Sequence, residues 1–333
     1  MLYISSRQPF LKLEKCNLEY ILQEKDRRYE TLYSFLKKYD RDDIAFIVSN
    51  SLVTETVEHI KEKNIHKNYN KVIVYMGELY WDTFNDSKTL DDLLEDNIYV
   101  IFNLFSNKSP YTLKTKSYTS IGSFGDITKL YLQKYDFKQK QKKYNLISKF
   151  GRPNKDRIVF YENLKNYKSF IYSINNFIYD SPYDIPSVGF KSEEHLKHDY
   201  KSYTLPKEDF QSIFSLDIET RLTQYGEAPH LVSCTEKTLK SFMFKRPSIN
   251  VIQKEAYDYL ESFGFEFPNY FGLDHKTQQL EICKRICELS LEECKELSLQ
   301  YKDVYEKNYQ KLLEFLEHHK NKLENIFYEL YHK

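Results

Sequence analysis

The residues best suited to chemistry lie in Leu231–Ile252, which reads LVSCTEKTLKSFMFKRPSINVI. This order of residue types predicts a loop, a helix that begins at Thr235-Glu236-Lys237, and a proline-marked turn before an apolar strand. A helix start presents free N–H groups and positive partial charge, which suit a diphosphate. Lys237 is unfavourable for the helix itself at that position, and a bound anion would explain it. Glu236 could accept hydrogen bonds from two adjacent ribose hydroxyls.

A simpler interpretation covers the same triplet. Ser233 or Thr235 would cap an ordinary packed helix, and Lys237 would extend into water. On physical grounds alone, a capped helix explains the triplet with fewer assumptions than a diphosphate site does. A binding role for the triplet therefore depends on the residues around it.

A second candidate is the acidic pair in Phe214–Thr220, FSLDIET. Asp217 and Glu219 resemble the first motif of proofreading-type 3′–5′ exonucleases, in which such a pair on a strand holds two metal ions for phosphodiester hydrolysis. Asn269–Asp274 is a loose match to their second motif. The third motif, a Tyr three residues before an Asp, does not occur after Asp274. A metal-dependent exonuclease, or the metal site of a single-lobe glycosyltransferase, is therefore the alternative interpretation of this pair.

Other clusters have ordinary explanations. His195 and His198 have a possible metal spacing, but a charged polar loop explains them equally well and no third ligand is evident. Three cysteines near one helix face are expected to be small buried hydrophobes; they are Cys283, Cys287 and Cys294. The basic run 138–143 is expected to be a solvated helix face that could steer DNA beside a cleft.

The elements that position these residues follow the pattern of an α/β protein. In the first half, short apolar runs alternate with helical patterns, which predicts a parallel sheet covered by helices. The expected strands are Ile44–Ser49, Val72–Met76 and Ile98–Asn103, and the expected helices are Thr54–Lys67 and Thr89–Glu95. Residues 1–40 and 126–150 are also expected to be helical.

A break at Gly151-Arg152-Pro153-Asn154 predicts a lobe boundary, with residues 1–150 before it and 151–290 after it. The second lobe is expected to contain helix Asp156–Asn166, strand Ser169–Ile174, strand Phe210–Asp217, helix Glu236–Lys245, strand Ser248–Ile252 and helix Glu255–Phe263. Residues 291–333 are expected to form a C-terminal helix that packs on the lobes through an apolar stripe. Two α/β lobes and a long closing helix are the predicted architecture.

Length, charge balance and cysteine content restrict the classes of protein to which this chain can belong. A chain of 333 residues is long enough for two domains. Its 49 basic and 49 acidic residues balance, which disfavours a partner held only through nucleic-acid phosphates. Five cysteines indicate a reducing compartment, and neither a signal peptide nor a membrane span is recognisable. We therefore expect a cytoplasmic protein, in the host cytoplasm if it is phage-encoded, whose oligomeric state stays open.

The segment around the triplet resembles the donor-binding motif of fucosyltransferase-like and exostosin-like glycosyltransferases, in which a TEK-type triplet opens a helix and a Pro and an apolar strand follow. The wider pattern is similar to glycosyltransferase-like proteins of phages and large viruses. It comprises Gly151–Arg157 (GRPNKDR), Phe214–Thr220, Leu260–Phe265 (LESFGF), and Asp274 followed by Arg285. The resemblance covers residues 150–290 and is weak in the first lobe.

The resemblance implies a GT-B fold with two Rossmann-like lobes and a nucleoside-diphosphate sugar, such as a UDP- or GDP-sugar, as donor. It implies that Glu236 binds the ribose and Lys237 the diphosphate, with Thr235 and Ser233 at the helix start and Arg157 near the same phosphates. The departing diphosphate would be stabilised by protein cations and helix dipoles, so no metal is required.

The acceptor and the catalytic base belong to the first lobe under this resemblance. The candidate bases near strand ends are Glu55, His59, Glu78 and Asp82, and the sequence does not choose among them. The similarity to phage proteins and a composition with AT-rich codons favour a hydroxymethylated pyrimidine in DNA as the acceptor. A surface glycan or a protein hydroxyl is the alternative.

Overall fold

The structure is a computed structural model of the chain. It describes residues 2–6, 12–16, 30–39, 41–49, 53–76, 97–103, 117–120, 141–151, 153–174, 207–219 and 236–332. The chain forms two compact units. The first unit comprises Met1–Ile127, His230–Val232 and Leu316–Lys333, and the second comprises Thr128–Pro229 and Ser233–Phe315.

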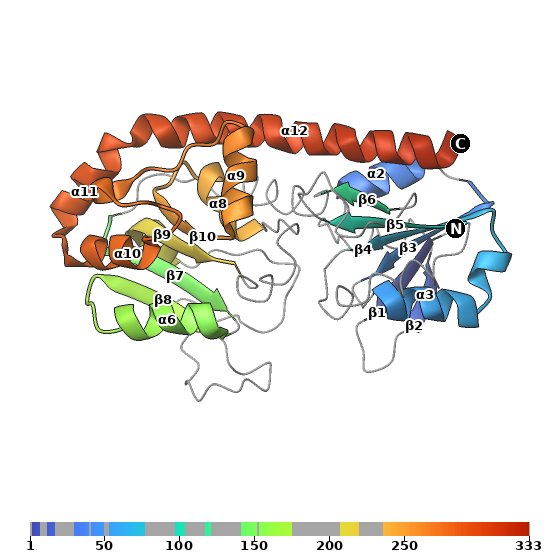
Figure 1. Ribbon diagram of the computed structural model, residues 1–333, viewed down its shortest axis with the longest axis horizontal. Coiled ribbons are helices and arrows are strands. Elements are labelled where there is room, and N and C mark those ends of the chain that lie inside the picture. Colours follow the sequence, from blue (N-terminus) through green and yellow to red (C-terminus); the bar gives the residue numbers. More distant parts are fainter. Residues whose placement is uncertain are drawn as a thin grey trace. The chain divides into compact units, whose positions relative to one another are not determined.

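The first unit contains a six-stranded sheet of order β2-β1-β3-β4-β5-β6. Its strands are β1 (Leu2–Ser6), β2 (Lys12–Cys16), β3 (Ile44–Ser49), β4 (Lys71–Met76), β5 (Ile98–Asn103) and β6 (Ser117–Ser120). Edge strand β2 is antiparallel to β1, and the other neighbours are parallel. The helices of this sheet are α2 (Glu30–Lys38), α3 (Val53–Glu62) and η2 (Ile65–Lys67). Figure 1 shows α2 on one face of the sheet and α3 on the other.

The second unit contains a four-stranded parallel sheet of order β10-β9-β7-β8. Its strands are β7 (Tyr144–Gly151), β8 (Phe170–Ile174), β9 (Ser212–Ile218) and β10 (Ser248–Val251). Its helices are α6 (Lys155–Leu164), α7 (Lys207–Gln211), α8 (Glu236–Met243), α9 (Lys254–Ser262), η5 (Tyr270–Gly272), α10 (Gln279–Glu288), α11 (Leu291–Gln300) and the start of α12 (Lys302–His332). Both units thus make this a mixed α/β protein with parallel-strand sheets.

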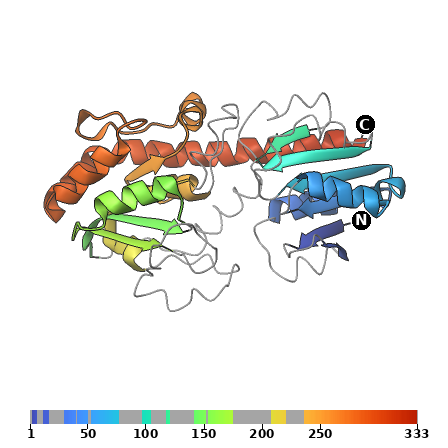
Figure 2. The same ribbon diagram turned by 60° about the horizontal axis from the view of Figure 1, so that its bottom comes forward.

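The two faces of the second sheet differ in chemistry. One face carries Phe214, Leu216 and Ile218 of β9 in a core shared with α6, α10 and α11; Figure 2 shows α6 against the sheet. Because side chains alternate along a strand, Ser215 and Asp217 point to the opposite face, which α8 covers. In the paired register, Ser248 lies beside Ser215 and Asn250 beside Asp217. The face beneath α8 is therefore polar, although its residues are largely buried.

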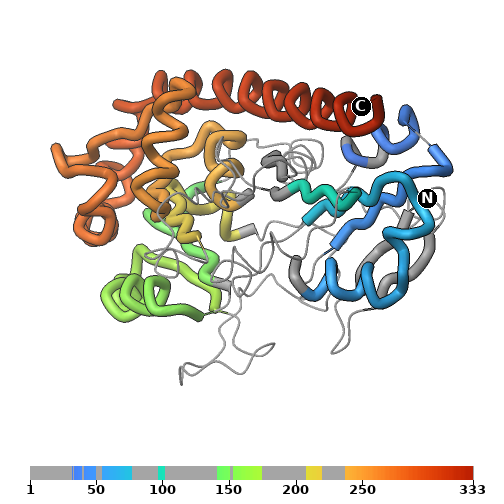
Figure 3. Tube along the Cα trace, turned by 45° about the vertical axis from the view of Figure 1, so that its right-hand side comes forward, coloured from blue at the N-terminus to red at the C-terminus, as the bar shows by residue number. Residues whose placement is uncertain are grey.

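Helix α12 supplies residues to the cores of both units. It spans 31 residues, and Figure 3 traces it as one continuous rod. In the second unit Phe315 contacts the rings of Phe263 and Phe265. In the first unit Phe327 contacts Phe35 and Phe46. Of the helices in the described part of the chain, none combines the length and the apolar character needed to cross a membrane.

Several expectations from the sequence are wrong. Residues 2–6 and 12–16 are strands, although the whole of 1–40 was expected to be helical. Residues 144–151 form β7, although 126–150 was expected to be helical. Because β7 pairs with β8 and β9, the division between units falls at 127/128 and not near 150. The C-terminal segment is two helices, α11 and α12, with a break at Tyr301.

Two of the misassigned strands, β2 and β7, carry charged residues beside apolar ones. An edge strand such as β2 needs only one apolar face, so its lysines and glutamate imitate a helical surface pattern. Strand β7 carries Asn145, Ser148 and Lys149 among its apolar residues. Asn145 donates to two carbonyls at the end of α10, and Lys149 pairs with Asp209. The helix expected at Thr89–Glu95 lies outside the described residues.

Candidate functional site

Strands β7 and β9 lie side by side, but their next strands are on opposite sides: β8 follows β7 on one side, and β10 follows β9 on the other. In open α/β sheets, ligands bind outside the carboxyl ends of strands at such a reversal of strand order. The carboxyl ends are Gly151 of β7 and Ile218 of β9. The candidate site is therefore centred on these two strand ends.

Arg157, in the first turn of α6, contacts the end of β9. Asn154 caps α6 by accepting a hydrogen bond from the Arg157 backbone N–H at 2.9 Å. The Arg157 guanidinium then donates to the Ile218 carbonyl at 2.9 Å and is 2% exposed. The sequence-predicted phosphate ligand is therefore at the carboxyl end of β9, where one of its nitrogens supports the strand end.

Helix α8 is attached to the end of β9 by a hydrogen bond. The Thr238 hydroxyl donates to Oε1 of Glu219 at 2.8 Å, and both side chains are buried. The helix begins at Glu236, as predicted, and Lys237 in its first turn is half-buried. Ser233, Thr235 and the side chain of Glu236 lie outside the described residues. The start of the predicted donor-binding helix is thus fixed at the reversal of strand order.

Asp217 lies beside protein donors. Its carboxylate accepts a hydrogen bond from Ser215 at 2.9 Å, and Lys240 Nζ lies 3.7 Å from its other oxygen. Glu219 is bound by Thr238 as described above. The described residues contain no group of three or more His, Cys, Asp or Glu side chains placed to hold a metal ion. This arrangement fits an ion-paired and hydrogen-bonded role for the pair better than the two-metal site of a nuclease.

Further charged groups lie on the same polar face, and we call them the charged layer: Lys142, Lys149, Asp209, Asp217, Lys240 and Arg246. Asp209 pairs with Lys149 and accepts from Arg246 at 2.6 Å. Burial raises the pKa of the Asp209 carboxyl, but the neighbouring cations outweigh burial and lower it. Burial also lowers the pKa of Lys149 to about 8. Sequence reasoning missed Lys149 and Asp209, because these two partners lie 60 positions apart in the chain.

One signal could have revealed this face. Ser215 and Asp217 alternate with apolar residues in β9, and Ser248 and Asn250 do the same in β10. A period-2 polar pattern in strands that are otherwise buried indicates a polar interior face.

Of the four candidate bases in the first unit, the structure describes Glu55 and His59. Glu55 is exposed in the first turn of α3, which follows the carboxyl end of β3. His59 lies one turn further along and is 3.7 Å from Glu62. Glu78 and Asp82 lie outside the described residues, as do His195 and His198. Cys283, Cys287 and Cys294 are buried, as predicted, and burial raises the pKa of each thiol.

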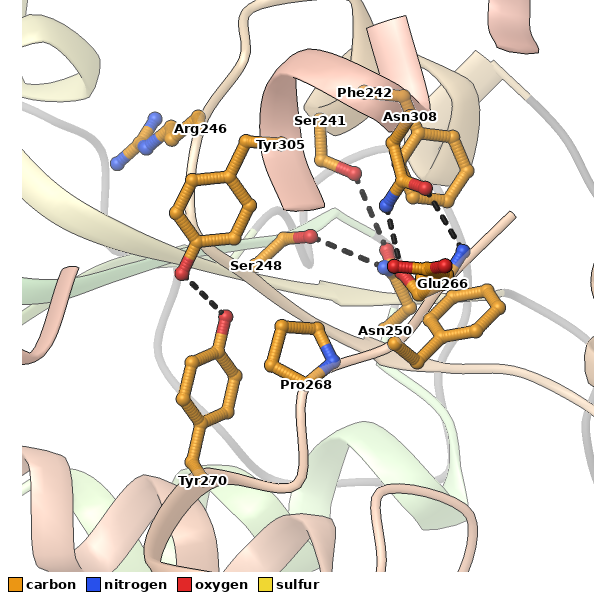
Figure 4. A pocket seen from close by; sticks show the side chains of 11 residues that line it. Ser241, Phe242, Arg246, Ser248, Asn250, Glu266, Pro268, Tyr270, Tyr305 and Asn308 are labelled. Atoms are coloured by element: carbon orange, nitrogen blue, oxygen red, sulfur yellow. Dashed lines mark hydrogen bonds between the residues drawn. The ribbon is translucent and has the colours of Figure 1, made fainter. Parts of the chain in front are cut away.

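A small cavity lies between β10, the end of α8 and α12 (Figure 4). Its volume of about 10 Å³ suits a single water molecule. Two buried hydroxyls, those of Tyr270 and Tyr305, form a hydrogen bond of 2.9 Å in its wall. This cavity is too small for a nucleotide, so it is not the proposed binding site.

No protein-family model, curated protein or solved structure matches this chain.

Proposed function

We propose that this protein is a glycosyltransferase whose second unit binds a nucleoside-diphosphate sugar at the carboxyl ends of β7 and β9. The observation that carries the proposal is the attachment of the start of α8 to Glu219 through Thr238. It places the N–H groups of a helix start at the reversal of strand order, where α/β sheets bind nucleotides. The TEK-type start of this helix resembles the donor-binding motif of fucosyltransferase-like and exostosin-like enzymes.

The roles follow from this placement. Lys237 and the helix start stabilise the negative charge on the departing nucleoside diphosphate. Arg157, buried at the end of β9, adds a positive charge behind the same site. Glu236 binds the ribose hydroxyls. Two units, one with a parallel sheet and one with a sheet that is parallel apart from edge strand β2, are compatible with the two Rossmann-like lobes of a GT-B enzyme.

The acceptor hydroxyl needs a base, which the proposal assigns to the first unit. Among the described candidates, Glu55 is exposed beside the carboxyl end of β3. The acceptor is a hydroxymethylated pyrimidine in DNA or a glycan hydroxyl. Mass spectrometry of both acceptors after incubation with pooled donors distinguishes the two.

The donor site is tested by titrating UDP- and GDP-sugars into the full chain and measuring binding by calorimetry. We expect one nucleotide class to bind, and Lys237→Ala to weaken its binding about tenfold or more, because a charge-assisted contact is lost. Lys302→Ala is the matched control, since Lys302 also stands at a helix start in the second unit but away from the sheet. Absence of binding by every nucleotide sugar would falsify the proposal.

A further inference from the structure

The small cavity between β10, the end of α8 and α12 brings together polar groups that their protein neighbours do not fully satisfy (Figure 4). Its wall includes Tyr270, Tyr305, Ser241, Ser248 and Asn250. Its volume of about 10 Å³ is enough for one water molecule, which needs about two to four polar partners to be held in place. The hydrogen bonds of the wall residues therefore decide what the cavity binds.

The two tyrosine hydroxyls carry one proton more than the bond between them uses. Tyr270 is 2% exposed and Tyr305 is 6% exposed, and burial raises the pKa of both hydroxyls, so each keeps its proton. Their bond of 2.9 Å uses one of these protons, whichever oxygen is the donor. A backbone hydrogen bond from Ser248 lowers the pKa of Tyr270, so Ser248 brings a further donor to the pair and not an acceptor. Within the described chain the second proton has no acceptor, and such a buried proton is costly.

Asn250 is a second wall residue whose hydrogen bonds are incomplete. It is 3% exposed, and its amide nitrogen donates one hydrogen to Ser248 Oγ at 3.1 Å. Its amide oxygen lies 3.5 Å from Ser241 Oγ, at the outer limit of a hydrogen bond. The single hydroxyl proton of Ser241 goes instead to the Thr238 carbonyl, at 2.8 Å. The amide oxygen of Asn250 is therefore available as an acceptor for a small polar molecule in the cavity.

A neutral molecule fits this wall better than an ion does. The wall contains two charged residues, Arg246 and Glu266. The Arg246 guanidinium already donates to Asp209 at 2.6 Å, and the Glu266 carboxylate pairs with Lys307. Neither charge is left to balance a bound ion. Water both accepts and donates hydrogen bonds, which matches one surplus hydroxyl proton and one available amide oxygen.

We propose that this cavity binds one ordered water molecule, which accepts the second proton of the Tyr270–Tyr305 pair and donates to the amide oxygen of Asn250. The water joins Tyr305 of α12 to Asn250 of β10, and it thereby helps to hold the long helix on the second sheet. The inference does not depend on the proposed function, because none of these residues belongs to the donor site.

The first test is a crystal structure of the full chain at a resolution at which ordered waters are visible. We expect electron density for a water in the cavity, within about 3.2 Å of a hydroxyl of the tyrosine pair and of Oδ1 of Asn250. A cavity without this density, or a water that contacts neither tyrosine hydroxyl, overturns the proposal.

The second test is the crystal structure of the double variant Tyr270→Phe/Tyr305→Phe. Both rings can keep their packing, but the surplus proton is gone, so the water is expected to leave its position. Tyr301→Phe is the matched control, because the Tyr301 ring packs against Tyr270 while its hydroxyl donates to the Asn269 carbonyl at 3.4 Å in an exposed position. The water should stay in this control. A water that also stays in the double variant would show that the tyrosine pair does not hold it, and the proposal would be refuted.

Discussion

The Thr238 hydroxyl and the Glu219 carboxylate, 2.8 Å apart and both buried, join the first turn of α8 to the end of β9. Two residues later on the same helix, Lys240 lies 3.7 Å from Asp217, which precedes Glu219 by two residues. Helix α8 thus contacts β9 through two polar pairs in succession. This arrangement aligns the helix start with the carboxyl end of the sheet, and its contribution can be measured.

Thr238→Val should lower the free energy of unfolding by about 1–2 kcal/mol, because it removes a buried donor from the Glu219 carboxylate. Urea denaturation measures the change. Thr277→Val is the matched control, since Thr277 donates to Asp274 at 2.6 Å in an exposed position. It should change stability by no more than about 0.5 kcal/mol. Equal losses in the two variants would show that the buried bond has no special role.

The stability of the protein should depend on the protonation of Lys149. Burial lowers the pKa of Lys149 from 10.5 to about 8, so between these pH values the unfolded chain binds more protons than the folded chain. The contribution of this group to the free energy of unfolding therefore rises with pH through this window. Urea denaturation from pH 7.5 to 9.5 should show a smaller rise for Lys149→Gln than for the wild type. In Lys302→Gln the free energy of unfolding should rise with pH as steeply as in the wild type. An equally steep rise in Lys149→Gln would contradict the buried position of Lys149.

Divalent metals should not stabilise the second unit, because Asp217 and Glu219 already contact protein donors. We expect the same melting temperature with Mn²⁺, with Mg²⁺ and with EDTA. A rise with Mn²⁺ that Asp217→Asn abolishes, together with Mn²⁺-dependent degradation of single-stranded DNA, would replace the glycosyltransferase proposal with the exonuclease alternative.

Gly264 ends α9 in a left-handed conformation with φ of +96°. The Phe265 N–H donates to the Leu260 carbonyl across this turn, as in a Schellman motif. Gly264→Ala should cost about 1–2 kcal/mol of stability from backbone strain, plus a further loss because the new Cβ would lie 3.1 Å from Lys311 Cε. Gly272→Ala isolates the strain alone, since φ is +72° there and no atom lies within 4 Å. A larger loss at Gly272 in thermal unfolding would argue against the contact with Lys311.

Apolar strands were predictable where both faces are buried. Ile44–Ser49 and Ile98–Asn103 have the bounds expected from the sequence, because a parallel strand between two helical layers appears as a continuous apolar run. Strand β7 was not predictable in this way, since Lys149 interrupts its apolar run and pairs with Asp209 of α7. The seven residues expected to form the apolar stripe of the C-terminal helix are all buried: Leu312, Phe315, Leu316, Leu323, Ile326, Phe327 and Leu330.

The candidate site was predictable only in part. Local pattern pointed to Lys237 and the acidic pair, because they lie at the start of a helix and the end of a strand, whereas Arg157 came from the resemblance to glycosyltransferases. Local pattern did not identify Lys149 or Asp209. These two side chains interact with each other although they lie 60 positions apart in the sequence. Long-range pairs of this kind are set by the topology of the sheet and leave no local pattern.

The division of α12 between two cores has a consequence for how the protein is made. The core of the first unit joins Leu32, Phe46 and Ile73 to Leu323 and Phe327. On the ribosome, where residues emerge from the N-terminus, the first sheet is synthesised early but its apolar face is covered only after the last helix has been released. A nascent chain that stalls before Leu316 would leave this face open to chaperones or to aggregation, so we expect the first unit to complete its folding only after residues 316–330 have emerged.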